Sequence, residues 1–146
     1  MSAFNHMNSY LRFCINRAKD QEISGKIFSQ RFLHPVEFTD LGTLILFLEE
    51  VFDRQSFPQA FQSTRTIVAG EHDLSLAAET PSDGITPPVV RAARGSVTTF
   101  DVLVVSRRSS SWQGSVDWLD GGERQEFGSF LELSRMINER LFGENR

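Results

Sequence analysis

The feature that most constrains the fold is a similarity between two stretches of the chain that lie 89 residues apart. Without a gap, residues 22–52 (EISGKIFSQRFLHPVEFTDLGTLILFLEEVF) align with residues 111–141 (SWQGSVDWLDGGERQEFGSFLELSRMINERL). The identical pairs are Gly25/Gly114, Glu37/Glu126, Phe38/Phe127, Leu44/Leu133 and Glu50/Glu139. These identities are few, but the apolar pattern and the turn signals also agree. We therefore interpret the two stretches as copies of one structural unit.

Each copy is predicted to contain three strands. Alternating apolar residues indicate the first strands, at Leu11, Phe13 and Ile15 and at Phe100, Val102 and Val104. The second strands present one face through Ile23, Gly25 and Ile27 and through Trp112, Gly114 and Val116. A short third strand ends in Glu-Phe in both copies. A glycine within a strand face often marks the close approach of another element, so we expect a helix or an aromatic ring to cross over Gly25 and Gly114.

Each copy then ends in an amphipathic helix. Asp40 and Ser129 occupy matching positions, and both are good N-cap residues. Ser129 and Glu132 have the spacing of a capping box. The apolar faces that follow are Leu41, Leu44, Ile45, Leu48 and Phe52 in the first helix, and Phe130, Leu133, Ile137 and Leu141 in the second.

A unit of three strands and one helix rarely buries a stable core alone, so the two units should share one core. The predicted class is therefore α+β: tandem duplicated β-β-β-α units form one pseudo-twofold domain, with two helices packed on an antiparallel sheet. We place the first unit at residues 1–62 and the second at 99–146. Residues 63–98, with Pro81, Pro87 and Pro88, have the composition of a partly flexible linker.

The strand WQGSVDW and the helix start EFGSFLEL carry a resemblance to other proteins. Together with GKIFSQRFLHPVEFTDLGTLILFLEEVFD and FPQAFQSTRT, they resemble a group of small bacterial proteins. That group has a W-Q-G-x-V-x-W strand followed by an F-x-S-x-L-E-L helix, and it has no established activity. The resemblance covers both units but not the linker. It implies a bacterial origin and a cytoplasmic location, and no particular chemistry.

Charge and cysteine content narrow the classes of function. The net charge of −4 argues against nucleic acid as a partner, because broad nucleic-acid binding needs a basic surface. The single cysteine excludes an intrachain disulfide, which suits the reducing cytoplasm. The N-terminus has no pattern of a signal peptide, and the longest apolar run, LILFL, is too short to cross a bilayer. We therefore expect a cytoplasmic protein without a membrane partner.

Chemical motifs are weak in this sequence. The three histidines lie in different segments and Cys14 stands alone, so no metal-ligand spacing appears and no cofactor is expected. The most suggestive polar group is the loop that carries Arg107 and Arg108 just before Trp112. With Lys19 at the matching place in the first copy, these residues could hold a phosphorylated or nucleotide ligand. The alternative is a solvated loop, with Trp112 in the core.

The two helices differ on their outer sides. Leu46 and Phe47 of the first helix match Arg135 and Met136 of the second. Leu46, Phe47 and Val51 could therefore form an apolar patch that contacts a protein partner or a second copy of the chain. The alternative is that the chain covers this patch with its own segment FPQAFQSTRTI.

These observations leave three functional hypotheses. The leading one is a non-enzymatic binding or adaptor protein that uses the outer side of the first helix. The second is a sensor of a small ligand at the basic loop. The third is an enzyme, although no nucleophile elbow or phosphate-binding loop is present in the sequence.

Overall fold

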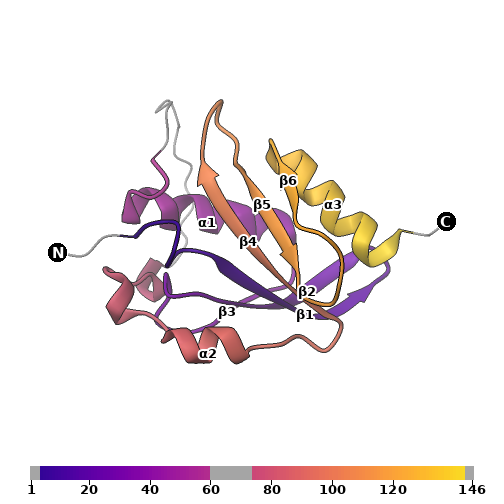
Figure 1. Cartoon of the computed structure of the whole chain (residues 1–146), viewed down its shortest axis with the longest axis horizontal. Coiled ribbons are helices and arrows are strands. Elements are labelled where there is room, and N and C mark those ends of the chain that lie inside the picture. The colour runs from indigo at the N-terminus through magenta and orange to yellow at the C-terminus, as the bar shows by residue number, and fades with distance from the viewer. Residues whose placement is uncertain (1–3, 60–73, 144–146) are drawn as a thin grey trace.

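The chain folds as an α+β protein around one six-stranded sheet, in a computed structural model that describes residues 4–59 and 74–143 (Figure 1). The elements are β1 (Leu11–Lys19), β2 (Glu22–Phe28), β3 (Val36–Phe38), α1 (Leu41–Gln55), α2 (Pro87–Ala92), β4 (Thr98–Ser106), β5 (Gln113–Trp118), β6 (Gln125–Phe127) and α3 (Phe130–Phe142). The strand order is β3-β2-β1-β4-β5-β6, and every neighbouring pair is antiparallel. The predicted α+β class with an antiparallel sheet is confirmed.

The strand pairings recur at the offset of 89 residues. The corresponding pairs are Ile15–Gly25 and Val104–Gly114 on the inner strands, and Gly25–Phe38 and Gly114–Phe127 on the outer ones. A shift in register follows directly after Ile15 in β1 and directly after Val104 in β4. Both third strands, β3 and β6, consequently lie at the outer edges of the sheet.

An ion pair joins the two halves at the centre of the sheet. Arg12 of β1 lies opposite Asp101 of β4, and its Nε donates to Oδ1 of Asp101 at 2.5 Å. The Arg12 guanidinium also donates to the carbonyl oxygens of Arg91 at 2.8 Å and Ala93 at 3.3 Å. Because Arg12 alternates with the core residues of β1, this contact attaches the end of α2 to the sheet face opposite the main core.

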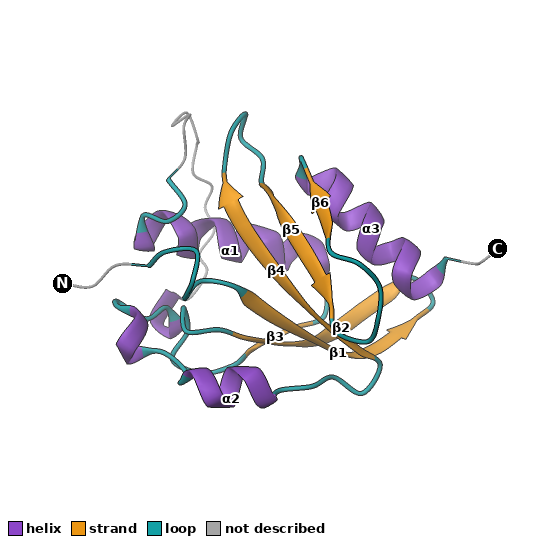
Figure 2. Cartoon of the chain, viewed as in Figure 1, coloured by secondary structure: helices purple, strands orange, loops and turns teal. Residues whose placement is uncertain are grey.

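Helices α1 and α3 begin as their cap residues predict. The Asp40 carboxylate accepts a hydrogen bond from the Thr43 amide at 2.8 Å, and the Ser129 hydroxyl accepts one from the Glu132 amide at 3.1 Å. Glu132 completes the N-terminal turn by accepting from the Gly128 amide at 2.8 Å. Both helices lie on the same side of the sheet, as Figure 2 shows.

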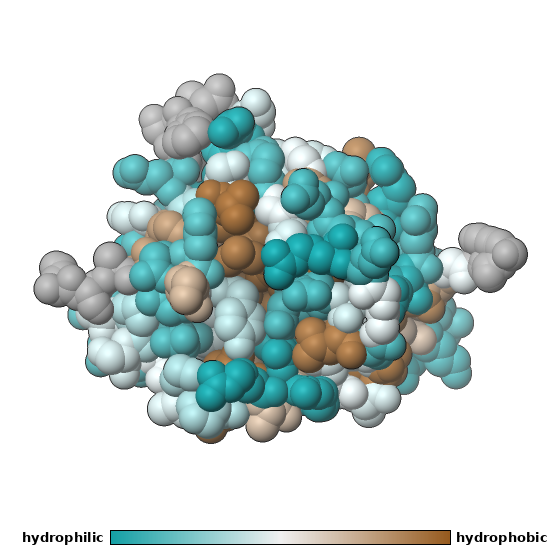
Figure 3. Space-filling model, viewed as in Figure 1, coloured by the Kyte–Doolittle hydropathy of each residue, from teal (hydrophilic) through white to brown (hydrophobic). Residues whose placement is uncertain are grey.

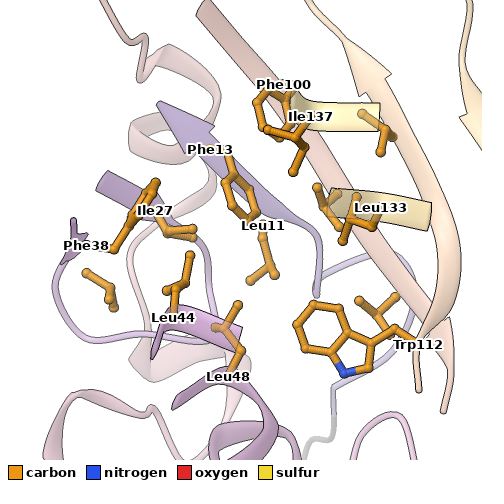
Figure 4. Close-up of a cluster of buried hydrophobic side chains, with 14 of the residues drawn as sticks. Leu11, Phe13, Ile27, Phe38, Leu44, Leu48, Phe100, Trp112, Leu133 and Ile137 are labelled. Carbon is orange, nitrogen blue, oxygen red and sulfur yellow. The ribbon is translucent and has the colours of Figure 1, made fainter. Parts of the chain in front are cut away.

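One hydrophobic core lies between these two helices and the sheet. Figure 4 shows Leu44 and Leu48 of α1 over the first half of the sheet, near Phe38. Leu133 and Ile137 of α3 cover the second half in the same way. The buried side chains of both halves form a single cluster, so the core is shared across the central strand pair.

The close approaches at Gly25 and Gly114 differ from the expectation. A Cβ atom at Gly25 would overlap the carbonyl oxygen of Cys14, and one at Gly114 would overlap the carbonyl oxygen of Leu103. At both positions the nearest atoms belong to the backbone of the neighbouring strand rather than to a helix. The expectation of an aromatic ring is confirmed at Gly114, where the Phe127 ring would lie 3.0 Å from the added atom.

The described part of the predicted linker contains regular structure. Besides α2, residues 74–98 include the 3-10 turns Leu74–Leu76 and Pro81–Asp83. The segment is held by backbone hydrogen bonds to residues 31–33, and it buries Ala78 and Val90. The composition of this segment suggested an irregular linker. It could not reveal the contacts that order the segment, because these are made with residues far away in the sequence. Residues 63–73 of the linker lie outside the described residues, and its flexibility stays a prediction.

Candidate functional site

Arg107, the first residue of the basic loop after β4, belongs to a buried polar network. Arg107 is only 3% exposed, and its guanidinium donates to Oε1 of Glu49 at 2.8 Å and to Oδ1 of Asp53 at 2.9 Å. The other carboxylate oxygen of Glu49 accepts a hydrogen bond from the indole nitrogen of Trp112 at 2.8 Å. Glu49 thus joins an arginine and a tryptophan from the β4–β5 hairpin to α1.

Aromatic rings enclose this network. Trp112 is 1% exposed and packs between Phe52 of α1 and Phe130 of α3, with ring centroids 5.2 and 4.8 Å away. Figure 4 shows the Trp112 ring at one end of the core. Because both helices contact the same indole, Trp112 packs the β4–β5 hairpin against α1 and α3.

A second buried arginine, Arg31, also lies against the Phe52 ring. The Arg31 guanidinium lies 4.3 Å from the Phe52 ring centroid, and it donates to the carbonyl oxygens of Ser9 and Phe57 and to the side chain of Gln55. Burial, and next the charge of Arg107, lower the pKa of Arg31 to about 9. Arg31 therefore stays protonated at neutral pH and joins the N-terminal segment to the end of α1.

The structure brings together only part of the predicted ligand set. Arg107 and Trp112 meet, but both are buried and bonded to Glu49. Arg108 is exposed on the same hairpin. Lys19 ends β1, and because β1 and β4 are antiparallel, it lies at the opposite end of the sheet from this hairpin. Lys19 thus does not share a site with the other three residues.

The predicted interface residues of α1 also separate into two groups. Leu46 is 61% exposed, and Phe47 is half-buried with its ring 6.3 Å from that of Phe32. Val51 is completely buried in the core and does not belong to the outer side. Val51 comes seven residues after Leu44 in the helix. Seven residues make nearly two full turns, so the two side chains point in directions within about 20° of each other.

A groove that the sequence did not indicate lies beside these outer residues. It has a volume of about 350 Å³ and runs between β3 and the first turns of α1. Its apolar side chains are Val36, Phe38, Leu44, Phe47 and Leu76. The sequence could not indicate this groove, because the edge position of β3 follows from strand pairing and Leu76 comes from the predicted linker.

A second, more polar pocket of about 430 Å³ lies between the β1–β2 hairpin and the start of α1. Ile23, Asp40 and Asn138 are among its lining residues. The positions 89 residues away from Ile23 and Asn138 are Trp112 and Glu49, which bond to each other. The pocket therefore lies beside the two residues that correspond, at this offset in the sequence, to the bonded pair Trp112 and Glu49.

Metal binding and cysteine chemistry find little support in the described parts of the chain. Within residues 4–59 and 74–143, His, Cys, Asp and Glu form no group of three or more that could hold a metal ion. Cys14 is buried, and this burial raises the pKa of its thiol to about 11, so the reactive thiolate is disfavoured.

Comparison with known proteins does not add a functional assignment. Scans against family models, curated proteins and solved structures give no match to this chain. Among the described helices, none has the length and apolar character needed to cross a membrane. The geometry of the two pockets and of the outer side of α1 is consequently the basis for a functional proposal.

Proposed function

We propose that this chain is a non-enzymatic binding or adaptor protein, with a protein partner docked on the outer side of α1 next to β3. The observation that carries the proposal is the position of Leu46, which is 61% exposed and one turn from Thr43 in the wall of the apolar groove. Residues three apart on a helix are neighbours on its surface. Leu46 and the groove together supply an apolar area larger than a single exposed leucine, and such areas mark interaction sites.

The difference between the two halves supports this location. We propose that the halves arose by tandem duplication and are related by a pseudo-twofold axis near Arg12 and Asp101, because their strand registers recur at one offset. At the positions of Leu46 and Phe47, the second helix has Arg135 and Met136. A leucine retained in only one half suggests a role beyond the shared fold. The single cysteine favours the reducing cytoplasm as the place of action.

The test replaces Leu46 with arginine, as in the second helix. We expect Leu46→Arg to keep the wild-type melting temperature, because the side chain is exposed, and to lose the partner that the wild-type chain retains in crosslinking and pull-down from its own cells. Leu131→Arg is the matched control, since Leu131 is 69% exposed on α3. Equal recovery of the partner by the two variants would contradict the proposal.

A second candidate function is the sensing of a small polar ligand. The pocket of about 430 Å³ favours it, because its volume is in the range of small-molecule sites. Glu22 and Asp40 line this pocket, and none of its described lining residues is basic. These groups suit an amine or another cation better than a phosphate, so the ligand chemistry differs from that expected at the basic loop.

Thermal shift with polyamines, amino sugars and nucleotides tests this candidate. A ligand at a hundred times its dissociation constant should add about 2.7 kcal/mol to the free energy of unfolding. The double variant Ile23→Trp/Asn138→Glu copies the residues that fill the second half, so it should abolish the shift. A shift produced by nucleotides and unchanged in that variant would instead support the loop at Arg108.

A further inference from the structure

Among the described residues, no strand pairs with the outer edge of β3, next to the groove. β3 is the first strand in the sheet order and pairs only with β2 among the described strands. An edge strand presents backbone donors and acceptors that another extended chain can use. Strand addition at an edge commonly combines such backbone pairing with pockets for alternate side chains. The apolar groove lies where those side chains would enter, between β3 and α1.

The three residues of β3 define what such a chain would meet. Val36 and Phe38 are 6% exposed and face α1, whereas Glu37 lies on the opposite face with its side chain 76% exposed. Nζ of Lys26 on β2 lies 4.0 Å from the Glu37 carboxylate. An added strand would lie on the side of β3 away from β2. A basic residue on that strand, opposite Glu37, would extend this cross-strand charge pattern, since opposite charges on neighbouring strands stabilise a sheet.

We propose that an extended segment of a partner protein adds to β3 as a further strand, with an apolar–basic–apolar sequence. Its two apolar side chains enter the groove formed by Phe38, Leu44 and Leu76, and its Lys or Arg lies opposite Glu37. This inference rests on the proposed binding function and specifies the partner's chemistry. Charge supports the choice, because Glu37 and Asp40 are at the groove and none of the described lining residues is basic.

A second copy of this chain fits the edge less well. Antiparallel pairing of two β3 strands about their middle residue would place Glu37 directly opposite Glu37 of the other copy. Like charges in that position are destabilising. The three-residue length of β3 also leaves few backbone hydrogen bonds to offset this repulsion. A segment with a central basic residue removes the repulsion and replaces it with attraction.

The experiment selects random heptapeptides displayed on phage against the immobilised full chain, followed by binding assays with synthetic versions of the enriched peptides. We expect enriched peptides to alternate apolar and other residues, with Lys or Arg between two apolar positions. Glu37→Lys should weaken a Lys-centred peptide about tenfold and should favour a Glu-centred version of it. N-methylation of the peptide backbone at the pairing amides should remove binding, because it removes the donors that pair with the strand.

Several outcomes would overturn this inference. Peptides with apolar residues at helical spacing would indicate a helical partner, and affinity that is insensitive to Glu37→Lys and to N-methylation would exclude strand addition. A wild-type dimer in analytical ultracentrifugation that Glu37→Lys dissociates would identify a second copy as the occupant. If Leu46→Arg alone releases the cellular partner while Glu37→Lys retains it, the strand model fails and the binding function stands.

Circular dichroism and the melting temperature verify that Glu37→Lys is folded, as expected for an exposed side chain. Glu126→Lys is the matched control, because Glu126 is the exposed middle residue of the other edge strand, β6. It should leave peptide affinity unchanged. An equal loss of affinity in both variants would show that overall charge, rather than the β3 edge, determines binding, and would overturn the proposal.

Discussion

Replacing Trp112 with alanine should lower the free energy of unfolding by about 3–5 kcal/mol, as measured by urea denaturation. The side chain is 1% exposed and lies between Phe52 and Phe130, so its removal leaves a cavity that two helices line. The Glu49 carboxylate also loses the indole donor that bonds to it at 2.8 Å. Leu131→Ala is a suitable control, because an exposed residue should change stability by no more than about 0.5 kcal/mol.

The same variant distinguishes the two interpretations of the basic loop. If Trp112 mainly stacks on a ligand, its loss should weaken ligand binding and leave the stability of the free chain unchanged. If it mainly holds the core, the free chain should be strongly destabilised. Wild-type stability of Trp112→Ala would therefore contradict the packing described above and favour the ligand-binding hypothesis.

Replacing Glu49 with alanine should cost about 3 kcal/mol, because the buried charge of Arg107 loses one of its two carboxylate partners. Arg107 is 3% exposed and would keep only the half-exposed Asp53 as an acidic partner among its described contacts. The indole nitrogen of Trp112 would also lose its acceptor. Urea denaturation, with the exposed Glu123→Ala as control, measures the difference.

Glu49→Gln refines this second prediction. The amide oxygen can still accept a hydrogen bond, but the negative charge next to Arg107 is lost. We expect a loss of stability smaller than that of Glu49→Ala. Equal losses in the two variants would mean that charge alone matters at this position, and no loss in either would show that the network does not support the fold.

The sequence alone was sufficient to predict the order of strands and helices in both halves. Strand alternation, the caps at Asp40 and Ser129 and the helical apolar faces depend on residues a few positions apart, so they are visible in the sequence. The same local geometry would have placed Val51 in the core, since it lies seven residues after Leu44. Trp112, interpreted in one alternative as a core residue, is buried.

Only the tertiary structure decided which distant residues meet. The bond from Trp112 to Glu49 spans 63 residues, and Arg107 reaches Glu49 over 58. Lys19 is separated from them because the central strands run antiparallel, which no local pattern reveals. Leu76 lines the groove because backbone bonds attach a proline-rich segment to residues near Phe32. Such contacts depend on how several elements pack at once, and a sequence pattern records only the preferences of each element alone.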